Sequence, residues 1–168
     1  MTARARFSGL SVIAVMLVAS EGSTADPTIQ SMASVREIYV TVADMPKELA
    51  DAGLTSDLLQ TDVELRLRSV GIRIVSSAEA IDAPSLQVSV NGLETQTARG
   101  AHLGYAAAVS FEFFQDVSLV RKPKLTLKAA TWSVSNVAVG PTTAVIRDCA
   151  KDLADKFAND FLTANPKK

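Results

Sequence analysis

The sequence has very few of the side chains that build metal centres and disulfide frameworks. Its 168 residues include one cysteine, Cys149, and one histidine, His102. A single cysteine excludes an intramolecular disulfide framework and any zinc site with several cysteine ligands. A single histidine excludes most metal centres that are built from several imidazoles. We therefore expect no metal ion and no cofactor.

An excess of charge of one sign is also missing. The 17 Lys and Arg residues nearly balance the 18 Asp and Glu residues, which leaves a formal net charge of −1. Because a nucleic-acid-binding domain carries a basic excess on one face, we expect no nucleic acid partner. The hydrophobic content of 48% is enough to build a core. A chain of this length has room for one ordinary domain.

The sequence lacks the motifs of common catalytic sites. It contains no Gly-x-Ser-x-Gly nucleophile elbow, no Ser-x-x-Lys motif and no phosphate-binding glycine loop. A hydrolase that uses His102 as general base would need a positioned nucleophile and an orienting acid. His102 lies between two glycines in a predicted surface loop, so we expect a protein that is not an enzyme, with the hydrolase as an alternative.

Other reactive side chains fit ordinary structural roles. Cys149 falls on the apolar stripe of a predicted helix, where a cysteine behaves as a small buried hydrophobe. A disulfide-linked dimer through Cys149 is the alternative. Asp148, Asp152 and Asp155 follow one flank of the same helix, where we expect them to be solvated, since a helix does not wrap around a cation.

The first 25 residues have the order of a secretory signal peptide. Arg4 and Arg6 precede an apolar run over residues 7–19, and small and polar residues then lead to a cleavage site after Ala25. An earlier cut within this small-residue segment is an alternative. The apolar run is shorter than the ~20 residues that a spanning helix needs. We expect an exported protein, periplasmic or secreted, with no transmembrane span after cleavage.

Residues 26–34 are small and polar, which predicts a disordered lead-in, and residues 35–166 are predicted to form a single domain. Alternating apolar residues predict strands over 38–42, 72–76, 86–91, 105–119 and 125–134. Helical spacing predicts two amphipathic helices, over 55–70 and from about 142 to 164.

This order is β-α-β-β-β-β-α. It is typical of an α+β two-layer domain, with a four- to five-stranded, mostly antiparallel sheet and both helices on one face.

Three segments resemble a group of exported bacterial proteins of unknown function. They are the stretch over residues 53–72, the tripeptide Thr131-Trp132-Ser133, and the end of the last helix over residues 161–166. More loosely, the order of elements is similar to the N-terminal domain of the Tol-system propeller protein. These resemblances imply a periplasmic or outer-membrane-associated accessory role and carry no site residue.

The sheet face away from the helices is the predicted interaction site. Its middle is small and uncharged, and such a face receives another protein or pairs into a dimer, the alternative being a merely solvated face. Trp132, the single tryptophan, is either packed in the core or a contact residue. The predicted site consists of Tyr39, Thr41, Gln87, Ser89, Ser110, Glu112 and Trp132.

We therefore expect a non-enzymatic accessory or interaction domain of the cell envelope, with a protein partner or as a homodimer. The alternative is a small-molecule or lipid carrier with a pocket between the sheet and the C-terminal helix.

Overall fold

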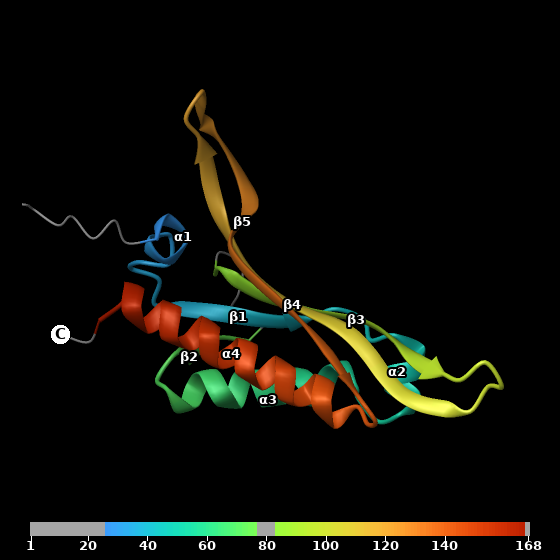
Figure 1. Ribbon diagram of the computed structural model, residues 1–168. Coiled ribbons are helices and arrows are strands. Elements are labelled where there is room, and N and C mark those ends of the chain that lie inside the picture. The colour runs from blue at the N-terminus through green and yellow to red at the C-terminus, as the bar shows by residue number, and fades with distance from the viewer. Residues whose placement is uncertain (1–25, 77–82, 167–168) are drawn as a thin grey trace, which may run out of the picture.

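A computed structural model describes residues 26–76 and 83–166, and the predicted signal peptide lies outside these residues (Figure 1). The described part contains one five-stranded sheet with the order β2-β1-β3-β4-β5. The strands are β1 Glu37–Val42, β2 Arg73–Ile74, β3 Ser85–Gln96, β4 His102–Leu119 and β5 Lys122–Gly140. The helices are α1 Pro27–Gln30, α2 Lys47–Asp51, α3 Ser56–Ser69 and α4 Ala144–Ala164.

The architecture is α+β, as the periodicity predicts. The long strands β3, β4 and β5 form an antiparallel meander. The sheet as a whole is mixed, because β1 lies between β2 and β3 and runs parallel to both. A helical crossover between neighbouring strands produces parallel pairing, and α3 supplies that crossover between β1 and β2.

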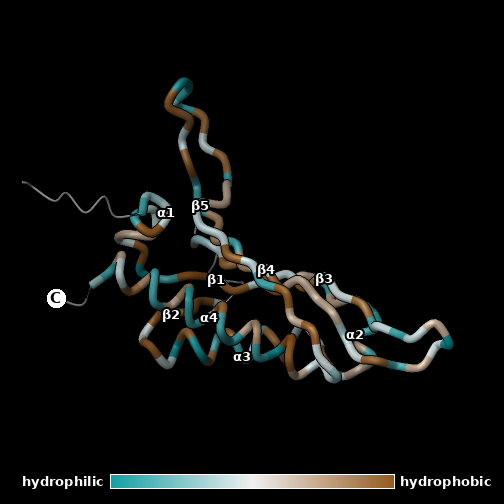
Figure 2. Tube along the Cα trace, viewed as in Figure 1, coloured by the Kyte–Doolittle hydropathy of each residue, from teal (hydrophilic) through white to brown (hydrophobic). Residues whose placement is uncertain are grey.

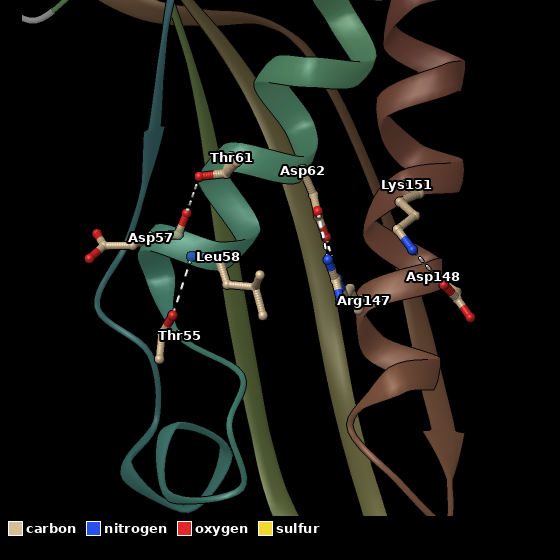
Figure 3. A network of polar contacts seen from close by, with 8 residues as sticks. All are labelled: Thr55, Asp57, Leu58, Thr61, Asp62, Arg147, Asp148 and Lys151. Carbon is tan, nitrogen blue, oxygen red and sulfur yellow. Dashed lines mark hydrogen bonds and ion pairs between the residues drawn. The ribbon is translucent and has the colours of Figure 1, made fainter.

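Helices α3 and α4 lie side by side on one face of the sheet (Figure 1). The Thr55 hydroxyl begins α3 by accepting a hydrogen bond from the backbone N–H of Leu58 (Figure 3). The Asp62 carboxylate of α3 accepts two hydrogen bonds from the Arg147 guanidinium of α4. These bonds hold the pKa of Asp62 below its usual range, so the two helices are joined by an ion pair over the pH range in which proteins are handled.

The core fills the layer between the two helices and the sheet. Alternating strand residues are fully buried, as their spacing predicts, and α3 and α4 each bury one stripe. Phe157 of α4 lies at the centre, with its ring 5.4 Å from Phe113, 5.1 Å from Trp132 and 5.8 Å from Phe161. Aromatic side chains therefore occupy the centre of the layer beneath α4.

The structure differs from the sequence prediction at residues 26–34, which are ordered. Asp26 caps α1, and Met32 is fully buried. Asn165, at the end of α4, donates from its amide to the Met32 carbonyl and accepts from the Ser34 N–H. The prediction of a disordered lead-in was wrong because these partners lie more than 130 residues away along the chain.

Strands β4 and β5 extend beyond the helices as a projecting hairpin (Figure 1). We call its residues 115–130 the arm. Gln115 holds the arm at its base, since its amide donates to the Ser31 carbonyl and to the Thr131 hydroxyl. Among the helices of residues 26–76 and 83–166, none has the length and apolar character that crossing a membrane requires.

Candidate interaction surfaces

The sheet face opposite α3 and α4 contains most of the predicted interaction residues. We call it the outer face. Strand register places Thr41 beside Gln87, Gln87 beside Glu112, and Ser89 beside Ser110. Tyr39 belongs to the same face because it alternates with the buried Ile38 and Val40. The structure therefore brings together six of the seven predicted residues: Tyr39, Thr41, Gln87, Ser89, Ser110 and Glu112.

Trp132 does not belong to the outer face. It pairs with Phe113 on the helix-covered side and is only 5% exposed. Its indole N–H donates to the Asp160 carboxylate at 3.0 Å. The outer-face prediction was wrong because β5 carries a bulge at Thr131, which reverses the faces of the residues before and after it. The core-packing alternative describes Trp132 correctly.

One end of the outer face is apolar and exposed. Leu93 is 58% exposed, Val137 67% and Val139 69%. Ala106 lies between Leu93 and Val139 in register, and an open hollow of about 500 Å³ is lined by Leu93, Ala106 and Val137. The predicted interaction site did not include Leu93, Val137 and Val139. The sequence contained a signal for the two valines, because they continue the two-residue alternation of Ser133 and Ser135 along β5.

Strand β5 lies at an edge of the sheet, and its second half has no charged residue that would discourage another strand from pairing with it. Residues 131–140, which we call the neutral edge, contain no Lys, Arg, Asp, Glu or Pro. Natural edge strands are usually blocked by such residues, since free backbone groups otherwise recruit another strand. The Val137 N–H is an exception to these free groups, because it donates to the side chain of Asn136 at 2.8 Å. Once that local bond is replaced, the neutral edge is suited to pairing with a further strand.

His102, the first residue of β4, contacts both β3 and the residue that follows β5. Its Nδ1 lies 2.8 Å from a Glu94 carboxylate oxygen, and the backbone of Pro141 is a second hydrogen-bond partner. The hydrogen bond to Glu94 is the main reason why the pKa of His102 is raised above its usual value. Both contacts favour the protonated ring, which is an acid. The Glu94 carboxylate on Nδ1 corresponds to the orienting acid of the hydrolase hypothesis, but among the described residues His102 has no hydrogen bond to a serine or cysteine nucleophile.

The pairing of His102 predicts a measurable titration. We expect NMR of this single histidine to give a pKa above the ordinary value of about 6.5, and we expect Glu94→Gln to lower it. Because the folded-state pKa is raised, the pair stabilises the fold below the unfolded pKa and loses that contribution as pH rises through the folded pKa. Glu112→Gln, which removes a distant carboxylate, should leave the titration unchanged. An unchanged pKa in Glu94→Gln would contradict the contact.

Cys149, Asp148 and Asp155 of α4 have structural roles, and Asp152 is exposed. Cys149 is buried, and burial raises the pKa of its thiol, which makes it a poor nucleophile. Asp148 pairs with Lys151, and Asp155 accepts two hydrogen bonds from Arg66 of α3. The Arg66–Asp155 pair joins α3 to α4, whereas Asp148 and Lys151 form an exposed pair within α4. Within the described residues no group of three or more potential ligands is placed to hold a metal ion.

No protein-family model and no curated protein sequence matches this chain. Among solved structures, it is similar to a PelC L103M dodecamer subunit from Paraburkholderia phytofirmans, with 16% identity, a TM-score of 0.43, and 77% of this chain and 87% of that chain covered. It is also similar to a minor lipoprotein from Acinetobacter baumannii, at 11% identity, TM-score 0.43, and coverage of 78% and 93%. The rare lipoprotein B from Shewanella oneidensis has 20% identity, a TM-score of 0.25 and coverage of 76% and 92%. With TM-scores below 0.5, these similarities carry no functional assignment.

Proposed function

We propose that this chain is a non-enzymatic, exported interaction domain of the cell envelope, and that it pairs with a second copy of itself along the neutral edge of β5. The observation that carries the proposal is this uncharged edge strand beside exposed valines. The order of the first 25 residues supports export. The side chains that fill the layer beneath α4 favour this function over a carrier, which would need a cavity there.

The neutral edge presents one row of backbone N–H and C=O groups on the side away from β4. A second strand that adds there satisfies these groups and extends the sheet. Val137 and Val139 then lie beside the side chains of the added strand and lose contact with water. The same exposed, uncharged strand would promote aggregation if it stayed free, which favours a defined partner.

A second copy fits this edge in one orientation. Two antiparallel copies of residues 131–140 are related by a two-fold axis, so each neutral stretch pairs with the other. The two arms then point to opposite ends of the dimer. A parallel arrangement would place the arms side by side, and each arm carries four cations against one carboxylate. Electrostatic repulsion therefore favours the antiparallel dimer.

The test is the mass in solution, measured by light scattering over a range of protein concentrations. We expect a dimer, and we expect Val137→Lys to weaken dimerisation at least tenfold because it places like charges on both sides of the two-fold axis. The matched control is Leu93→Lys. Leu93 is similarly exposed on the same face, but it belongs to β3, which β4 separates from the neutral edge. Its substitution should change the dissociation constant less than twofold.

Two results would contradict the proposal. A wild-type protein that is monomeric at 0.1 mM, roughly the upper end of such measurements, would exclude a stable self-association. Equal weakening by Leu93→Lys and Val137→Lys would show that copies meet through the outer face and not through the edge. Circular dichroism spectra of both variants establish that they remain folded.

A further inference from the structure

The arm is an amphipathic hairpin that projects from the rest of the molecule (Figure 1). Register pairs Val117 with Leu127, while Asp116 pairs with Lys128 and Ser118 with Thr126. Because neighbouring strand residues point to opposite faces, one face of the arm is aliphatic and the other is polar. Figure 2 shows hydrophobic residues along both strands of the arm and hydrophilic residues at its tip.

The aliphatic side chains near the tip are exposed. Val120, in the turn, is 99% exposed, Leu125 is 47% exposed and Leu127 is 38% exposed. The aliphatic face continues the helix-covered side of the sheet past the ends of α3 and α4, and among the described helices only α1 lies near the arm, at its base. Exposed aliphatic groups that gather at one projecting end are typical of a contact site.

The charge of the arm differs from that of the rest of the chain. Its four cations are Arg121, Lys122, Lys124 and Lys128, and its one carboxylate is Asp116. Asp116 pairs with Lys128 at 3.1 Å, whereas the other three cations have no carboxylate partner among the described residues. Because the whole chain has a net charge of −1, the remainder is acidic. An anionic surface therefore attracts the arm and repels the remainder, which orients the molecule with the arm first.

We infer that the arm binds an anionic lipid surface. Val120 and Leu125 enter the boundary between headgroups and acyl chains, and Arg121, Lys122 and Lys124 contact the lipid phosphates. A lipid surface satisfies both features at once, since its anionic layer lies directly above an apolar layer. The tip is the projecting end of a hairpin in which cationic and aliphatic residues follow one another from Val120 to Leu125. A projecting tip inserts into a lipid layer without a matching pocket on the partner, whereas a protein partner would need such a pocket. The shape therefore favours a lipid surface over an acidic protein.

The test compares binding of the purified protein to two kinds of vesicle in a flotation assay. We expect binding to vesicles of phosphatidylcholine with 30% phosphatidylglycerol, a composition on the order of that of an anionic leaflet. Binding to pure phosphatidylcholine vesicles should be at least tenfold weaker. Lys122→Glu combined with Lys124→Glu should weaken binding to the anionic vesicles more than tenfold, and Val120→Ser severalfold. The matched control, Arg99→Glu, reverses an exposed cation in the opposite hairpin and should change binding less than twofold.

A second measurement reports insertion directly. An environment-sensitive dye on Val120→Cys should shift to shorter emission wavelengths with anionic vesicles, and the same dye on Arg99→Cys should not. Labelling is selective because Cys149 is buried. Equal binding to both kinds of vesicle, or binding unaffected by the arm substitutions, would overturn the inference. So would a preference for a soluble acidic polypeptide that Val120→Ser does not weaken, which would assign the arm to an acidic protein. These outcomes are independent of dimerisation, because the substitutions lie outside the neutral edge.

Discussion

Phe157→Ala will lower the free energy of unfolding by about 3–5 kcal/mol, the usual loss for truncating a fully buried phenylalanine. Phe157 is completely buried, and its ring lies between those of Phe113, Trp132 and Phe161. The substitution removes contacts between α4 and the sheet and leaves a cavity that these rigid rings cannot fill. Because α4 supplies the largest buried stripe among the described helices, the loss affects the whole domain.

Urea denaturation followed by circular dichroism measures this effect. Asn159→Ala is the matched control, since Asn159 is an exposed residue of the same helix and its substitution should change stability by about 0.5 kcal/mol or less. A loss below about 1 kcal/mol in Phe157→Ala would show that the aromatic cluster does not form the packed centre. A loss of stability in Asn159→Ala without one in Phe157→Ala would lead to the same conclusion.

Gly104→Ala will also destabilise the fold strongly, by about 3 kcal/mol or more, because strain and a steric clash act together. Gly104 has a φ of 145°, which side chains rarely tolerate. A Cβ atom there would lie 2.3 Å from the Gly140 carbonyl oxygen and 3.0 Å from the Pro141 Cα. Both neighbours are backbone atoms at the end of β5, so relieving the clash requires β4 and β5 to separate.

Gly100→Ala is the comparison that isolates the clash. Gly100 also has a positive φ, of 80°, but a Cβ atom there would have no neighbour within 4 Å. We expect it to cost about 1–2 kcal/mol from backbone strain alone. Thermal or urea unfolding of both variants gives the difference. Equal losses would mean that β4 and β5 do not approach closely at Gly104.

Much of the fold follows from local spacing. The four-residue spacing of Leu59, Val63 and Leu67, with Thr55 before it and Gly71 after it, predicts α3 within a residue or two of its observed bounds. The two-residue alternation of β3 and β4 likewise predicts which residues form the outer face. Helices and strands have fixed periods, so a sufficiently long element reveals its buried side from sequence.

The features that the sequence did not predict depend on register between distant segments. The face of Trp132 depends on a single extra residue at Thr131. The change of face between Leu127 and Trp132 predicts a bulge near Ala129 or a strand covered on both sides, and only the register with β4 decides between the two. The burial of Met32 depends on Asn165 at the other end of the chain. The arm and the neutral edge likewise became visible only once the helices and strands had been placed. Alternation shows that a strand has two different faces, but exposure depends on what packs against each face, and that is decided by tertiary structure.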